Sequence, residues 1–147
     1  MTGRKTYQLL ILRILTVLLL VGICHSAKSQ QYSEYEVKAG YLYNFSKFIK
    51  WPDHAFKNQD SPFVIGIYGE NPFQDILEKV LKGRKIANRN WIIKHYQSPD
   101  NIQECHILFI GKVKRSEMID ALKKVYKKPI LTVGDNLEEF CENGGVI

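Results

Sequence analysis

The sequence lacks the motifs on which most catalytic and metal sites depend. It has only three cysteines and four histidines among 147 residues, and no G-x-S-x-G motif. Cys105-His106 together with Cys141 is the one set that could hold a metal, and we do not expect it to do so. Gly66-x-x-Gly69 has neither the G-x-G-x-x-G spacing nor the lysine of a P-loop. We therefore expect no catalytic residues, no metal and no cofactor.

The sequence also lacks an apolar run long enough to span a bilayer as a helix. Its longest run, residues 14–24, has about eleven residues and follows a short basic segment. Small residues come next, and cleavage after Ser26 or after Ser29 fits them equally. This pattern is typical of a secretory signal peptide, so we expect residues 1–29 to direct export and residues 30–147 to form one domain. An uncleaved membrane anchor is the alternative.

Little excess charge remains once the leader is set aside. Four of the 21 basic residues and none of the 15 acidic ones precede residue 30, which leaves a net charge of +2 on residues 30–147. We therefore expect no nucleic-acid partner. Residues 112–128 hold seven basic residues against two acids, which is typical of a solvated helix face, although anionic lipid or an acidic partner could meet it.

Residues 37–52 predict a helix that ends at Trp51, because Pro52 disfavours helical geometry in the residue before it. At helical spacing, one arc of this segment is apolar and the opposite side is mainly polar. The expected inner arc contains Val37, Tyr41, Leu42, Phe45, Phe48 and Ile49, and the expected outer side contains Glu36, Gly40, Tyr43, Ser46, Lys47 and Lys50. Lys38 interrupts the apolar arc. Either it extends its amine to water, or the ammonium faces a cleft or a buried partner.

The rest of the chain alternates between strand and helix patterns. Apolar, β-branched runs predict strands at residues 63–68, 91–93, 105–110 and 129–133, with a further strand opening at 144–147. Helices are expected from Asn71-Pro72 to Leu81, after a Ser116 cap, and briefly after Ser98 and Asp135. This order predicts a three-layer α/β fold of the Rossmann or flavodoxin-like kind, with a mainly parallel sheet and helices on both faces.

Ligands of such sheets bind at the carboxyl ends of the strands, which places a candidate site at Gly69-Glu70, Gly111-Lys112 and Gly134-Asp135. The sequence does not decide whether Cys105 and Cys141 form a disulfide. Cys105 opens a predicted strand and Cys141 lies beyond the exit of another, and opposite ends of strands can be about 15 Å apart, whereas a bridge needs Cα atoms within about 7 Å. The short helix after Asp135 could bring Cys141 back toward Cys105.

The stretch K-A-x-x-L-Y-N-F-x-K-F-x-x-W-P at residues 38–52 resembles the opening signature of the YfiR-like family of small secreted bacterial proteins. G-x-N-P-F at 69–73, C-H-I-L-F-I at 105–110, and P-I-L-T-V-G-D through G-G-V-I at 129–147 agree in order and spacing. The resemblance implies a final strand and helix beyond G-G-V-I, so we expect the C-terminal part of the domain to be missing. It also implies two disulfides. Cys105 and Cys141 match one cysteine of each, one missing partner falls at Gly66, and the other at or beyond residue 147.

The resemblance implies a non-catalytic periplasmic regulator. It would bind and repress the sensor domain of an inner-membrane diguanylate cyclase, and so affect cyclic-di-GMP and biofilm formation. The alternative is a small-ligand sensor that acts on a membrane histidine kinase or an outer-membrane uptake receptor. A homodimer is left open. The repressor requires exposed aromatic surface such as Tyr35, Tyr43 and Trp51, and the ligand sensor requires a pocket that includes Lys38 or Asp135. The candidate contact residues are Lys38, Tyr43, Asn44, Trp51 and Asp135.

Overall fold

The computed structural model describes residues 7, 11–15, 32–135 and 137–146. The chain divides into two units, Met1–Tyr32 and Ser33–Ile147. In the first unit, residues 11–15 are helical, and most of the predicted signal peptide lies outside the described residues. No helix in the described ranges is long and apolar enough to cross a membrane.

The second unit alternates helices and strands, as expected. Its elements in chain order are α2 (Glu34–Phe48), η1 (Asp53–Ala55), β1 (Phe63–Tyr68), α3 (Ile76–Leu81), β2 (Trp91–Tyr96), η2 (Pro99–Asn101), β3 (Ile107–Ile110), α4 (Arg115–Val125) and β4 (Leu131–Gly134).

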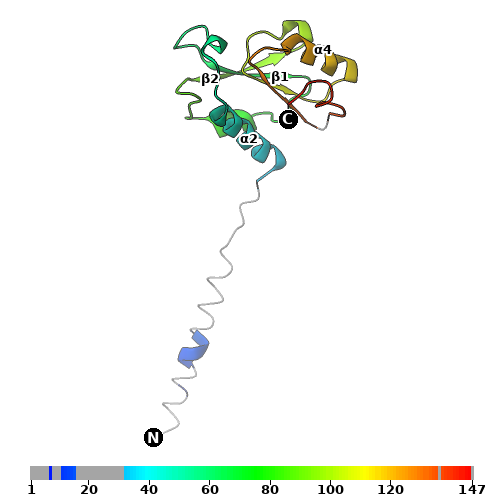
Figure 1. The fold of residues 1–147 in the computed structure, drawn as a ribbon. Helices are drawn as coiled ribbons and strands as arrows, with labels where there is room; N and C mark the ends of the chain where they lie inside the picture. The colour runs from blue at the N-terminus through cyan, green and yellow to red at the C-terminus, as the bar shows by residue number, and fades with distance from the viewer. Residues whose placement is uncertain (1–6, 8–10, 16–31, 136, 147) are drawn as a thin grey trace. The chain divides into compact units, whose positions relative to one another are not determined.

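The strands form one parallel sheet in the order β2-β1-β3-β4 (Figure 1). β1 is paired on both sides, with Ile65 opposite Ile93 of β2 and opposite Ile107 of β3. The chain therefore winds one way from β1 to β2 and the other way from β3 to β4. In doubly wound sheets, ligands bind where the winding direction changes, outside the carboxyl ends of the strands.

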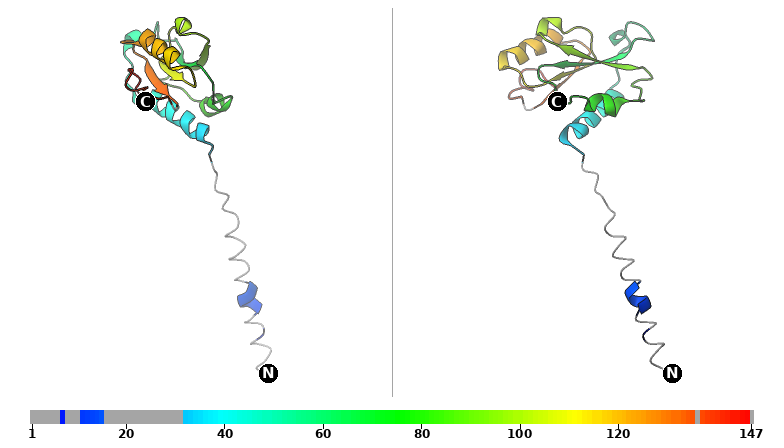
Figure 2. Two further views of the ribbon diagram at one scale, coloured as in Figure 1. Left: turned by 90° about the vertical axis from the view of Figure 1, so that its right-hand side faces the viewer. Right: turned by 180° about the vertical axis from the view of Figure 1, so that it is seen from behind.

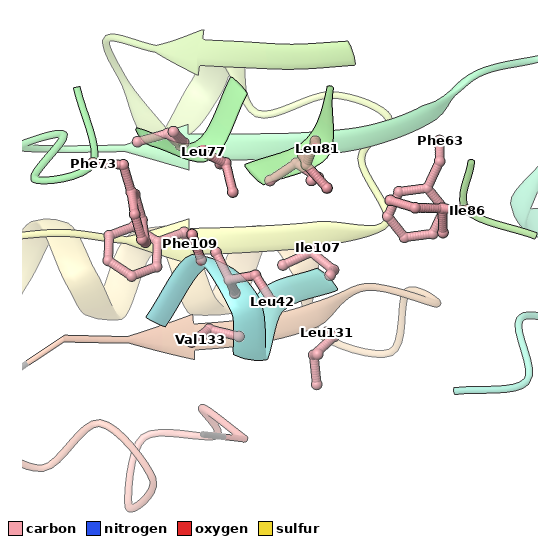
Figure 3. Close-up of a cluster of buried hydrophobic side chains, with 13 residues drawn as sticks. Leu42, Phe63, Phe73, Leu77, Leu81, Ile86, Ile107, Phe109, Leu131 and Val133 are labelled. Atoms are coloured by element: carbon pink, nitrogen blue, oxygen red, sulfur yellow. The ribbon is translucent and has the colours of Figure 1, made fainter. Parts of the chain in front are cut away.

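Every residue of β1 is buried, because both faces of the sheet are covered. Alternate side chains of the strand enter two separate cores. Phe63, Ile65 and Ile67 pack with side chains of α2 and α3 on one face. Figure 3 shows this core, with Leu42 of α2 and Leu77 and Leu81 of α3 labelled. Val64 and Tyr68 pack with α4 on the other face. Figure 2 shows α4 on the opposite side of the sheet from α2 and α3. The predicted three-layer α/β fold is confirmed.

Two predicted helix starts and one predicted strand are wrong. α3 begins at Ile76 instead of Pro72, because Gln74 has a φ of 50°, which an α-helix does not accommodate. Asn71 instead closes a local turn by accepting the N–H of Phe73 at 3.0 Å. The cap residue of α4 is Lys114 and not Ser116. At the end of the described chain, residues 144–146 form no strand.

The predicted inner face of α2 is only partly right, since Leu42, Phe45 and Ile49 pack on the core and the other three residues do not. The helix begins at a Ser33 cap and buries Ala39, Leu42 and Ser46 against the sheet. Val37, Tyr41 and Phe48 were expected inside, yet their exposed fractions are 45%, 56% and 82%. Because α2 carries apolar residues on two opposite sides, the sequence pattern alone did not identify the side that packs on the sheet.

Candidate functional site

The three predicted loops meet at the carboxyl edge of the sheet. They line a cavity of about 390 Å³, which we call the strand-end cavity. Its lining residues are Tyr35, Glu70, Pro72, Gly111, Lys112 and Asp135. The loops after β1, β3 and β4 each contribute to this lining, and α2 contributes Tyr35. The cavity thus lies where the parallel topology places ligand sites.

Two glycines allow the loops after β1 and β3 to lie against each other. A Cβ on Gly111 would stand 1.9 Å from the carbonyl oxygen of Glu70, which no side chain tolerates. Gly69 has a φ of +83°, and a Cβ there would meet Val113 at 2.4 Å. Close backbone approach therefore shapes this edge of the cavity.

An ion pair joins α2 to the loop after β4. The ammonium of Lys38 lies 2.5 Å from Asp135 Oδ1 and 2.5 Å from Glu34 Oε1. The hydroxyl of Tyr35 donates to Asp135 Oδ2 at 3.3 Å, and Lys38 stands 4.9 Å from the centre of the Tyr35 ring. The Asp135 side chain is only 12% exposed. Lys38 therefore faces a largely buried partner and does not extend freely to water.

The pKa values of this group follow from its contacts. Burial alone lowers the pKa of Lys38, but hydrogen bonds to Asp135 and Glu34 outweigh burial and raise it to about 12. Burial, followed by the negative charge of Asp135, raises the pKa of Tyr35. Lys38 is therefore a fixed cation and Tyr35 a neutral donor at physiological pH.

A second cavity of about 190 Å³, the apolar pocket, adjoins the same ion pair. Its lining residues are Lys38, Tyr41, Leu42, Phe45, Phe73, Phe109, Val133, Gly134 and Asp135. The rings of Phe73 and Phe109 meet edge to face with their centres 4.7 Å apart. Asp135 lines both cavities, so the Lys38–Asp135 pair stands between a polar and an apolar binding space.

The strand-end cavity is equipped to bind charged groups. Glu70 and Lys112 are both exposed, and within the described residues neither side chain forms an ion pair or a hydrogen bond. They offer one negative and one positive group on a surface whose other charge, Asp135, is already neutralised by Lys38. Such a lining can bind and orient a small charged ligand or a polar segment of a partner.

The other three candidate contacts lie outside both cavity linings. Tyr43 is half-buried, with the Arg84 guanidinium 4.7 Å from its ring centre. Trp51 is half-buried, and its Nε1 donates to the carbonyl of Ser46 at 3.1 Å. Asn44 is exposed on the outer side of α2.

The expectation of an exposed aromatic surface at Tyr35, Tyr43 and Trp51 is therefore wrong, since all three are half-buried against the core. The exposed aromatic side chains of α2 are Tyr41 and Phe48. Sequence reasoning missed them because it assigned them to the core. The signal that could have found them is the width of the apolar pattern, which exceeds the single arc that a sheet can cover.

The two cysteines that remain after residue 29 are not bridged. Cys105 is buried and Cys141 is exposed, and both carry free thiols. The bridge that the sequence left open is thus absent from this structure. Burial raises the pKa of the Cys105 thiol to about 12, which keeps it protonated at physiological pH. Among the described residues, no three His, Cys, Asp or Glu side chains are grouped closely enough to hold a metal ion.

These features define a doubly wound α/β domain with a binding edge at the carboxyl ends of its strands. The chain belongs to the YfiR/HmsC-like family, whose model matches residues 35–147. Proteins of this family are periplasmic regulators of diguanylate cyclase signalling, which implies a regulatory role and a membrane sensor protein as partner. No curated protein matches the sequence significantly.

Proposed function

We propose that this protein is exported to the periplasm, binds the sensor domain of an inner-membrane diguanylate cyclase and holds that enzyme inactive. The observation that carries the proposal is the family match over residues 35–147. Repression would lower cyclic-di-GMP and reduce biofilm formation. The N-terminal leader pattern supports the location, because residues 14–24 are apolar and follow a basic segment.

A non-catalytic role agrees with the chemistry of the strand-end cavity. Its lining supplies a phenol, two carboxylates and an ammonium, without a Ser, Cys or Thr nucleophile beside a base. The carboxylate of Asp135 is held by Lys38 and Tyr35. We therefore assign these groups to binding a partner.

The test is a capture experiment followed by a measurement in cells. Residues 30–147 are immobilised and incubated with detergent-solubilised inner membranes, and bound proteins are identified by mass spectrometry. We expect one enriched membrane protein with a periplasmic sensor domain and a cyclase domain. Absence of any such protein from both oxidised and reduced samples would contradict the proposal.

Cyclic-di-GMP is then measured in cells that express the full chain. We expect a lower level than in cells with an empty vector. The matched control is residues 30–147 expressed without the leader, which stay in the cytoplasm and should leave the level unchanged. An equal fall with both forms would show that the effect does not require export.

The strand-end cavity also favours a second candidate, a small-ligand sensor that acts on a histidine kinase or an uptake receptor. Here the carrying observation is a cavity of about 390 Å³ in which Glu70 and Lys112 have no side-chain ion pair or hydrogen bond to any described residue. Thermal unfolding is measured with a panel of small carboxylates, amines and sulfonates, because a ligand that binds the folded state raises the Tm. Lys112→Gln should abolish a shift caused by an anion, whereas Lys82→Gln, outside the lining, should retain it. The absence of any shift would exclude this candidate for these ligand classes.

A further inference from the structure

The turn between α4 and β4 carries four lysines within six residues, 123–128, which we call the basic tip. Lys123 and Lys124 lie in the last turn of α4, and Lys127 and Lys128 follow Tyr126 before β4 begins. All four lysines are exposed, and Tyr126 is 70% exposed. Exposed lysines around one exposed aromatic ring are typical of surfaces that meet a membrane interface.

Backbone hydrogen bonds hold the basic tip in a defined turn. The amide of Lys128 donates to the carbonyl of Val125 at 3.0 Å, and the amide of Ile130 donates to the carbonyl of Lys128 at 2.8 Å. Lys127 has a φ of 60°, which turns the chain sharply at the end of α4. Its ammonium stands 5.4 Å from the centre of the Tyr126 ring. The ring and a positive charge are therefore presented together, and little ordering is needed when the tip binds.

The two lysines on α4 each have a carboxylate nearby. Asp120 Oδ1 lies 3.9 Å from the ammonium of Lys123, and Asp100 Oδ1 lies 3.4 Å from that of Lys124. Both pairs are exposed and long, so they bind their lysines weakly. These two ammonium groups can exchange their carboxylates for another anion at small cost.

The two lysines beyond α4 have no such partner. Within the described part of the chain, neither Lys127 nor Lys128 forms an ion pair. Glu104 lines a cavity of about 240 Å³ together with Lys128, but its carboxylate is paired with Lys57 at 2.9 Å. The basic tip therefore presents uncompensated positive charge at its outer end.

The basic tip and the strand-end cavity lie at opposite edges of the sheet. All four strands are parallel. The tip leads into the amino end of β4, whereas Asp135, in the lining of the strand-end cavity, follows the carboxyl end of the same strand. A surface that binds the tip therefore leaves the strand-end cavity accessible.

We propose that the basic tip docks the protein on the surface of a bilayer that contains anionic lipid. The lysine ammonium groups contact the headgroup phosphates, and the Tyr126 ring enters the headgroup layer. Docking holds the domain beside the membrane with its strand-end cavity open to a partner. This proposal does not depend on the proposed repressor function.

Two features of the tip favour lipid over an acidic protein. Its cations are all lysines, compact point charges that suit many mobile phosphates, whereas carboxylates of a protein partner are matched best by the planar fork of arginine. Tyr126 has an apolar ring and a polar hydroxyl, a combination that suits the boundary between hydrocarbon and water.

The binding should be weak and sensitive to salt. Each lysine close to an anionic surface strengthens binding by roughly fivefold. Salt screens these charges, since the Debye length falls from about 10 Å at 0.1 M to about 3 Å at 1 M ionic strength. We therefore expect reversible binding that is lost as sodium chloride is raised to about 0.5 M.

The first test is co-sedimentation of residues 30–147 with vesicles. This fragment retains the whole unit Ser33–Ile147 and omits the apolar residues 14–24, which would themselves bind lipid. We expect binding to vesicles of phosphatidylglycerol and phosphatidylcholine in equal parts, and none to phosphatidylcholine alone. Absence of binding to the anionic vesicles at low salt would overturn the proposal.

Charge variants then locate the contact. Lys127→Gln combined with Lys128→Gln should weaken binding by roughly tenfold or more. The matched control is Lys82→Gln combined with Lys85→Gln, which removes the same charge from two exposed lysines in and after the end of α3, on the other face of the sheet. Equal losses in the two double variants would show that only the total charge matters and would refute the basic tip as the contact. Circular dichroism checks that each variant is folded.

The second test asks whether the ring at position 126 enters the lipid. Tyr126→Trp is mixed with vesicles whose phosphatidylglycerol carries brominated acyl chains, which quench tryptophan fluorescence at short range. We expect stronger quenching than in the natural sequence, where Trp51 and Trp91 are half-buried. Quenching no stronger than in the natural sequence would contradict the proposal. Soluble polyglutamate is the competing probe, and binding to it as tight as to the vesicles would indicate an acidic protein partner instead of lipid.

Discussion

The ammonium of Lys38 lies 2.5 Å from the Asp135 carboxylate, although the two residues are 97 positions apart in the chain. This contact ties the first turns of α2 to the end of β4 and separates the strand-end cavity from the apolar pocket. It is partly buried, with side-chain exposures of 29% for Lys38 and 12% for Asp135. Because it fixes the border between the two binding spaces, its loss should affect both stability and binding.

We expect Asp135→Ala to lower the free energy of unfolding by about 1–3 kcal/mol, because Lys38 and Tyr35 each lose a partly buried partner. The loss should lie toward the lower end of this range, since Lys38 keeps its contact with Glu34. The measurement is urea unfolding followed by circular dichroism. Asp75→Ala is the control, because its ion pair with Lys79 is about 70% exposed on both sides and should contribute at most about 1 kcal/mol. Equal losses in the two variants would contradict this account.

His106 should make stability depend on pH. The backbone N–H of Val64 donates to its Nδ1 at 3.0 Å, so Nε2 carries the proton and donates to the Ala55 carbonyl at 3.1 Å. The ring is stacked between Phe56 and Phe63. Burial of this neutral ring lowers the pKa of His106 below its ordinary value of 6.5.

The unfolded state therefore takes up this proton at a higher pH than the folded state. The contribution of His106 is complete above about pH 6.5 and is lost as pH falls toward the folded pKa, with a slope of at most 1.4 kcal/mol per pH unit. Urea unfolding between about pH 7.5 and 5.5 measures this slope. His106→Asn should be less stable at every pH and lack the slope, whereas the exposed His54→Asn should retain it. A slope that survives His106→Asn would assign it to another group.

The sheet and the location of the strand-end cavity were predictable because both follow from local signals. β1 is a continuous apolar run, as a strand covered on both faces must be, and parallel strands bring their carboxyl ends to one edge. The sequence alone therefore predicts that Glu70, Lys112 and Asp135 lie together.

The features that could not be predicted depend on contacts distant in sequence. The sequence pattern around Lys38 does not indicate that Asp135 is its partner. The buried side of α2 was misassigned because Tyr41 and Ala39 lie on different apolar sides, and only the sheet decides between them. The late start of α3 depends on the positive φ of Gln74, which the residue types around it do not indicate.

Gly66 stands beside the buried Cys105 thiol. A Cβ at Gly66 would lie 3.3 Å from Cys105 Sγ, which is close to the separation that an S–S bond of about 2.04 Å requires. It would also lie 2.6 Å from the ring of Tyr96, so that ring must shift. We predict that Gly66→Cys forms a disulfide with Cys105 under oxidising conditions, as the family resemblance at this position suggests.

The reduced Gly66→Cys variant should be less stable than the natural sequence by about 1–3 kcal/mol, since it overpacks the core against Tyr96. Oxidation should then recover about 2–4 kcal/mol, because the new bond closes a loop of nearly forty residues. The measurement is the Tm of oxidised and reduced protein in a Cys141→Ser background, with thiol labelling after unfolding to count free cysteines. Gly40→Cys, whose Cβ would meet no atom within 4 Å, is the matched control and should leave Cys105 free. Labelling of both thiols in oxidised Gly66→Cys would contradict the prediction. It would show that the Tyr96 ring does not shift and that the strands hold the two sulfur atoms too far apart to bond.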